Sequence, residues 1–170
     1  MIALRHLVAV AVLPFTVAVL VPLWLARRAG LAPGWATTAP GMAAQALGLI
    51  LLAVGLTLFV ASLRRFATEG RGTLAPWDPP RELVVRGPYR YVRNPMISGV
   101  LLFLLGEALV LRSPPHLTWA LTFFAVNALY IPVLEEPGLE ARFGGTYRAY
   151  CRRVPRLIPR LKPWKGAESS

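Results

Sequence analysis

Four long apolar runs constrain the fold of this chain more than any other feature. They cover residues 7–26, 42–63, 96–111 and 117–134. Each run approaches the roughly 20 residues that cross a hydrocarbon core of about 30 Å, although the third is short for a full span. We therefore predict an all-α integral membrane protein with about four transmembrane helices, the third paired tightly with the fourth.

The placement of charge predicts the topology. The chain is 55% hydrophobic and carries a formal charge of +11. With four spans, sixteen of the nineteen basic residues lie on one side, at position 5, in 64–93 and after 134. The positive-inside rule then places both termini and the 64–93 loop in the cytoplasm. The cations flank the spans and suit anionic headgroups, so we expect the bilayer of the cell membrane, and not nucleic acid, as their partner.

The runs also predict the domain organisation, a single membrane domain over 1–170. Residues 1–63 form two N-terminal spans, and 64–170 form a cytoplasmic loop, two further spans and a tail. The first run is interpreted as a retained span because it is longer than a typical secretory apolar core and leads into ARRAG. The lone Cys151 excludes an internal disulfide and a cysteine metal cluster, and we expect no metal.

The tail has the pattern of an amphipathic helix. Apolar side chains recur there at helical spacing, at Leu139, Phe143, Tyr147, Tyr150, Cys151 and Val154. Arginines occupy the other faces, which predicts a C-terminal helix at the membrane interface. Glycines at 144 and 145 weaken this helix and the prolines from 155 onward end it, with Trp164 as an anchor at the level of the headgroups.

Three acidic residues lie within or at the end of an apolar run, where an ionisable side chain is costly unless it has a partner or a function. Glu107 falls within the third run, where a hydrogen bond to Asn127, protonation or a role in a site would each explain it. Glu135 and Glu136 follow the fourth run, where mutual repulsion and the helix dipole both disfavour them. This pair predicts a nearby cation, either an arginine of the loop or tail, or a ligand with an ammonium or sulfonium group.

The stretch RGPYRYVRNPMISG, residues 86–99, predicts a helix start at the membrane surface. Gly87 and Pro88 indicate a turn, Asn94 suits the N-cap, and Pro95 suits the first helical position. Free N–H groups at such a start favour an anion, and Gly99 one turn later permits close approach of a chain or a flat ring. A capped span with interfacial aromatics has the same pattern. The helix start and the glutamate pair together would offer one site for an anion and one for a cation, which would suit a zwitterionic ligand.

These motifs resemble a known family. RELVVRGPYRYVRNPMISG, followed about 36 residues after Gly99 by EEPGLEARFGGTYRAYCRRVPRLIP, resembles the isoprenylcysteine carboxyl methyltransferase and phospholipid methyltransferase superfamily of integral membrane enzymes. The resemblance covers residues 72–159 and makes 64–170 a methyltransferase-like core. It implies S-adenosylmethionine bound by the cytoplasmic ends of the last two spans and by the flanking loop and tail.

The resemblance also implies site residues. The cofactor-binding set it suggests is Arg81, Glu82, Leu83 and Val84 in a strand-like segment, Tyr89 near the nucleoside, Asn94, Pro95, Met96, Ile97 and Gly99 at the helix start, and Glu135 with Glu136 beside it. Prenylcysteine enzymes have His at position 94, Tyr at 97 and Arg at 131, where this chain has Ile131. A prenylcysteine carboxylate is therefore disfavoured as the substrate.

The resulting hypothesis is S-adenosylmethionine-dependent methyl transfer to a lipophilic small molecule or lipid at the cytoplasmic membrane face. Transfer from a sulfonium depends on alignment and desolvation and needs no metal. No catalytic residue is assigned, although Tyr89, Glu136 or water could accept a proton. Two alternatives remain open: an NADPH-dependent membrane reductase related to sterol reductases, and a non-catalytic membrane scaffold. The acceptor and the oligomeric state also remain open.

Overall fold

The computed structural model describes residues 11–31, 34–69 and 83–165, which contain helices and no strand. The all-α prediction is therefore confirmed for this part of the chain. The residues form two compact units. Unit 1 comprises Met1–Thr57 and Gly99–Phe124, and unit 2 comprises Leu58–Ser98 and Ala125–Ser170.

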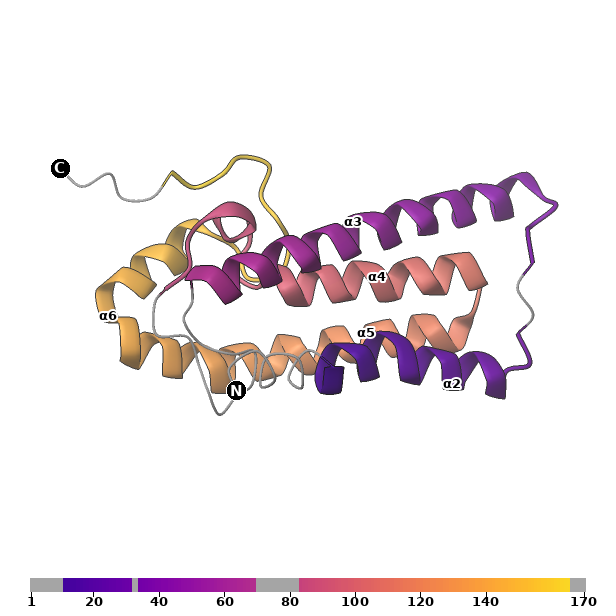
Figure 1. Ribbon diagram of the computed structural model, residues 1–170, viewed down its shortest axis with the longest axis horizontal. Helices are drawn as coiled ribbons and strands as arrows, with labels where there is room; N and C mark the ends of the chain where they lie inside the picture. The colour runs from indigo at the N-terminus through magenta and orange to yellow at the C-terminus, as the bar shows by residue number, and fades with distance from the viewer. Residues whose placement is uncertain (1–10, 32–33, 70–82, 166–170) are drawn as a thin grey trace. The chain divides into compact units, whose positions relative to one another are not determined.

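Eight helical elements follow one another along the described chain (Figure 1). They are η1 (Ala11–Leu20), α2 (Val21–Arg28), α3 (Ala39–Glu69), η2 (Gly87–Arg90), α4 (Pro95–Leu111), α5 (Pro114–Tyr130), η3 (Ile131–Glu135) and α6 (Glu136–Arg153). Two stretches are long and apolar enough to cross a membrane, Ala39–Arg65 and the continuous Pro114–Arg153. The third apolar run forms the shorter helix α4, and the first is described only from residue 11, so two of the four predicted spans are supported by length.

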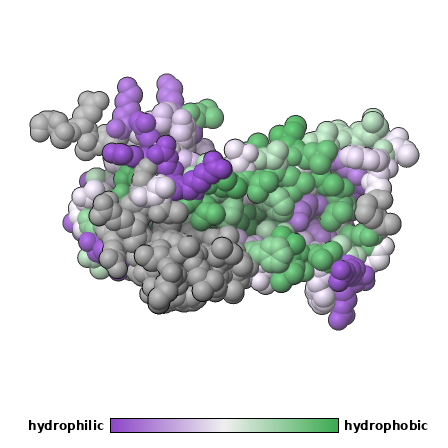
Figure 2. All heavy atoms as spheres, in the orientation of Figure 1, coloured by the Kyte–Doolittle hydropathy of each residue, from purple (hydrophilic) through white to green (hydrophobic). Residues whose placement is uncertain are grey.

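The apolar side chains of the two long helices face outward. Of the 18 most apolar consecutive residues in Ala39–Arg65, only 17% are buried within the protein, and in Pro114–Arg153 the corresponding share is 11%. Figure 2 shows apolar residues on the surface of the helices of unit 1. The core helix of a soluble protein would bury these groups, whereas a lipid-facing helix exposes them. Their exposure therefore supports a membrane location.

Two pairs of glycines bring α3 and α4 together within unit 1. A Cβ added to Gly48 would stand 2.8 Å from the Gly106 carbonyl oxygen, and one added to Gly55 would stand 2.6 Å from that of Gly99. The two glycines of each helix are seven residues apart, so they share one face of that helix. Small residues at such a crossing let the backbones of membrane helices approach closely. The close approach predicted at Gly99 is therefore made by α3.

Replacing Gly48 by alanine tests this crossing. The added methyl group meets backbone atoms of α4 that cannot rotate away, so we expect a loss of about 1–3 kcal/mol in the free energy of unfolding. Thermal unfolding in detergent micelles measures it. Gly138→Ala is the matched control, because an added Cβ there meets nothing within 4 Å and alanine favours the helix. Equal melting temperatures for the two variants would contradict the close crossing.

Unit 2 is built around the second half of α6. Gly144 adopts φ 55° and ψ −129°, which bends α6 into two legs at the point where the glycines were expected to weaken it (Figure 1). The buried core of the unit consists of Tyr147, Tyr150 and Val154. Around it pack Leu83, Val85, Leu139, Phe143, Cys151 and Trp164. The apolar face predicted for the tail is thus the core of this unit, and α6 ends at Arg153 ahead of Pro155, as predicted.

Candidate functional site

The loop ahead of α4 forms one wall of the candidate site. Gly87, with φ 56°, opens the helical turn η2 and leads to Tyr89, which is buried. The hydroxyl of Tyr150 donates to the Tyr89 carbonyl at 2.6 Å and fixes this turn to the core of unit 2. Helix α4 begins at Pro95, as predicted, and the Asn94 carbonyl accepts its first hydrogen bond from the Ser98 N–H at 3.0 Å.

The residues after α6, 154–165, here called the C-terminal segment, run along this loop. The backbone N–H groups of Arg93 and Asn94 donate to the carbonyls of Pro155 and Arg156 at 2.8 and 3.1 Å. The Asn94 side-chain amide also donates to the Arg156 carbonyl, at 3.3 Å. Further along, the Trp164 N–H donates to the Arg90 carbonyl at 2.9 Å. The position of the loop therefore depends on residues that come much later in the chain.

Glu136 is held by two arginines, one from the loop and one from the C-terminal segment. Its carboxylate accepts two hydrogen bonds from Arg156, at 2.7 and 2.8 Å, and lies 2.8 Å from Nη1 of Arg93. The side chains of Arg93 and Glu136 are only 11% and 18% exposed. The same Nη1 lies 2.7 Å from the Cys151 sulfur. The cation predicted for the glutamate pair is thus supplied to Glu136 by the protein itself.

Glu135 has no such cation. It ends the π-helical turn η3, which contains Pro132, a residue without an N–H for regular helical bonding. The side chain is partly buried, and within 11–31, 34–69 and 83–165 no hydrogen-bond donor or cation contacts its carboxylate. One glutamate of the pair is therefore neutralised and the other keeps its capacity to bind a positive group.

Two more polar groups of unit 2 lack partners. Among the described residues, the Tyr89 hydroxyl and Nε of Arg93 are buried without a hydrogen bond. Burial, with a further contribution from the negative charge of Glu135, raises the pKa of Tyr89, so its phenol stays protonated and can donate. Buried polar groups without partners are rare in folded proteins. Unit 2 therefore offers an acid and two donors to a ligand.

Most of the residues suggested by the resemblance lie in unit 2. Val84 and Tyr89 are buried, Leu83 packs against the core, and none of the described residues 83–85 forms a strand. Asn94, Pro95, Met96 and Ile97 form the start of α4, as expected. Gly99 belongs to unit 1, and Arg81 and Glu82 lie outside the described residues.

Sequence reasoning did not place Arg93 or Arg156 beside the glutamate pair, and it named Tyr150 only as part of the apolar face of the tail. It predicted a cation beside the glutamates, either an arginine of the loop or tail or a group on a ligand, but no particular arginine could be specified. The available signal was the abundance of arginines in both segments, which does not distinguish the buried Arg93 from exposed arginines.

The fold and the site define a helical membrane protein with a polar site built from a loop, a helix start and a glutamate pair. Residues 43–146 match the phospholipid methyltransferase family, and the chain belongs to this family. It is also similar to methanethiol S-methyltransferase 2 of Bradyrhizobium diazoefficiens, with 43% identity over 76 residues. That match covers 43% of this chain and 27% of the relative, so this chain aligns with about a quarter of the length of the relative.

Proposed function

We propose that the chain is an S-adenosylmethionine-dependent methyltransferase that modifies a lipophilic acceptor at the cytoplasmic face of the membrane. Membership in the phospholipid methyltransferase family supports methyl transfer in a membrane. The observation that carries the proposal is the unpaired set in unit 2, namely the Glu135 carboxylate, the Tyr89 hydroxyl and Nε of Arg93.

These three groups fit the polar groups of the proposed cofactor. Glu135 would hold an ammonium or sulfonium group, the Arg93 N–H would hold a carboxylate, and the Tyr89 hydroxyl would donate to an acceptor on the nucleoside. When bound, S-adenosylmethionine supplies an electrophilic methyl group on its sulfonium. The contribution of the chain is to orient the reactants and to exclude water from them.

The structure also limits which residue could accept a proton from the methyl acceptor. Glu136 is bound by two arginines, which favours its ionised form and occupies its oxygens. Tyr89 is a neutral phenol and a poor base, because its pKa is raised by burial and by Glu135. Since Glu135 is assigned to the positive group of the cofactor, an amine or thiol acceptor would lose its proton to water.

A small thiol is the first acceptor to test. The name of the Bradyrhizobium relative refers to methanethiol, and the match of 76 residues at 43% identity supports a related acceptor. A phospholipid amine is the second, on the description of the family. Ile131 is buried and apolar where a prenylcysteine enzyme carries an arginine, which argues against a prenylcysteine carboxylate.

Binding and transfer assays on the purified protein in nanodiscs test the proposal. We expect isothermal titration to show binding of S-adenosylmethionine and not of NADPH. We also expect a labelled methyl group to reach methanethiol or phosphatidylethanolamine, and not farnesylcysteine. Binding of NADPH alone would favour the reductase, and binding of neither would favour the scaffold. Transfer to farnesylcysteine alone would leave methyl transfer standing and contradict the argument from Ile131.

A further inference from the structure

Two large apolar side chains of the C-terminal segment are exposed. Ile158 is 77% exposed and Leu161 is 99% exposed. The backbone around them is fixed, because the Arg160 N–H donates to the Tyr91 carbonyl at 3.0 Å and the Trp164 N–H is bonded in the same way to Arg90. Two large apolar side chains that are exposed on a backbone fixed by hydrogen bonds are typical of a contact surface.

Trp164 does not share this exposure. Its ring centroid lies 5.6 Å from that of Tyr150, so it packs against the core of unit 2. The large apolar side chains that the segment leaves exposed are thus Ile158 and Leu161 rather than Trp164, which the sequence suggested as an anchor.

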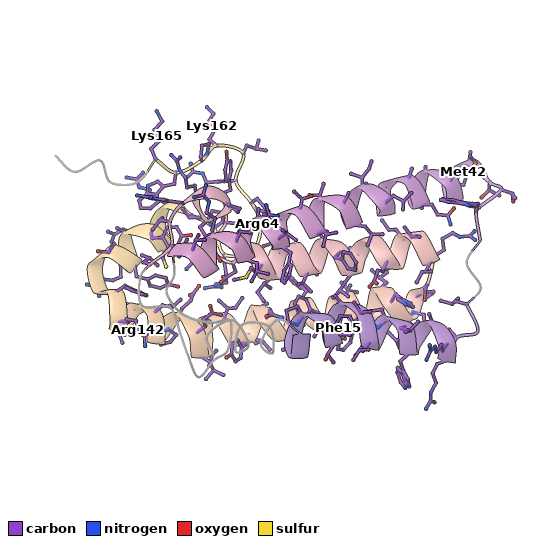
Figure 3. The ribbon with its side chains drawn as sticks, viewed as in Figure 1. Phe15, Met42, Arg64, Arg142, Lys162 and Lys165 are labelled. Atoms are coloured by element: carbon purple, nitrogen blue, oxygen red, sulfur yellow. The ribbon has the colours of Figure 1, made fainter. Side chains whose placement is uncertain are left out.

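The charge around the exposed pair is of one sign. Residues 141–165 contain eight basic residues and no acidic one. Lys162 and Lys165 are exposed and extend away from the C-terminal segment on one side of it (Figure 3). Figure 2 shows hydrophilic residues gathered there, with apolar ones among them. Such a surface is complementary to an apolar layer bordered by negative charge.

We propose that the C-terminal segment docks on the anionic phospholipids of the cytoplasmic leaflet, with Ile158 and Leu161 entering the headgroup layer and Lys162 and Lys165 binding phosphates. A lipid surface is favoured over an acidic protein because the segment follows Pro114–Arg153, a helical stretch that is long and apolar enough to cross the bilayer and that bends at Gly144. The proposal does not depend on methyl transfer.

A spin label tests this contact in the full chain. The label is attached at Leu161→Cys in a Cys151→Ser background, and the protein is reconstituted in phosphatidylcholine vesicles with or without phosphatidylglycerol. With phosphatidylglycerol at low salt, we expect the label to collide with oxygen and to be shielded from a water-soluble nickel chelate. The variant Lys162→Gln/Lys165→Gln should lower the ratio of docked to free segment about thirtyfold, since each basic side chain contributes a factor of about five. High salt should act in the same direction.

Arg148→Gln is the matched control. It removes one exposed positive charge from α6, where Glu140 at 3.1 Å already balances it, so we expect little change in label accessibility. Unchanged melting temperatures show that the variants fold. A label equally open to the nickel chelate in both kinds of vesicle would overturn the proposal. Shielding that depends neither on phosphatidylglycerol nor on salt would overturn it too, because it would show apolar insertion without recognition of anionic lipid.

Discussion

We expect Glu135→Gln to lower the affinity for S-adenosylmethionine about ten- to hundredfold, because a hydrogen bond to a charged group contributes about 1.5–3 kcal/mol. Among the described residues, no cation contacts this carboxylate. Replacing it by an amide therefore removes the negative charge that the ligand would bind and breaks no ion pair within the protein. Isothermal titration in nanodiscs measures the change.

The same variant should not lose stability. Glu135 stands beside Glu136, and removing one of two adjacent negative charges relieves repulsion, so the melting temperature should stay level or rise. Glu140→Gln is the control, because this acid lies five residues further on, in α6, in an exposed pair with Arg148. If Glu135→Gln melted early while it bound the cofactor normally, Glu135 would be structural and the proposed site would be wrong.

Glu136→Gln has the opposite signature, a large loss of stability. It leaves Arg93, whose side chain is only 11% exposed, without its counter-charge, and the single amide oxygen can accept at most one of the two hydrogen bonds from Arg156. We expect a loss of about 3 kcal/mol, the lower end for breaking a buried ion pair, because Glu136 is partly exposed. For a chain of this size this lowers the melting temperature by roughly 6–12 °C. Thermal unfolding in detergent micelles measures it.

Glu140→Gln again provides the comparison, since it breaks an exposed pair on the same helix. Exposed pairs contribute about 0–1 kcal/mol, so this variant should melt close to the parent protein. Equal losses for the two variants would show that the two arginines around Glu136 are no more important to the fold than a surface contact.

The parts of the fold that were predictable are those determined locally. Asn94 and Pro95 predict the start of α4, and the two glycines at 144 and 145 predict the weak point of α6, where the structure has a bend, because proline and glycine act on their own backbone. Hydropathy predicted the two long helices and the shortness of α4 for the same reason. Each of these features can be read within about 20 residues.

The parts that could not be predicted depend on distant pairings. The sequence indicated that the glutamate pair needs a cation, but which acid receives it depends on Arg156, 20 residues beyond Glu136, folding back. The glycines of α3 and α4 were visible at their spacing of seven, yet nothing in either run says that they meet. Such contacts follow from tertiary packing, which a pattern within one run does not encode.

The hydrogen bonds between the loop and the C-terminal segment have a consequence for biosynthesis. Asn94 binds the carbonyl of a residue 62 positions later, so its partner does not yet exist when the loop leaves the ribosome. Until then the N–H groups of Arg93 and Asn94 are satisfied by water, and closing so long a loop carries an entropic penalty. The loop therefore takes its final position only after the residues that follow α6 have been made, later than the helix α4 to which it leads.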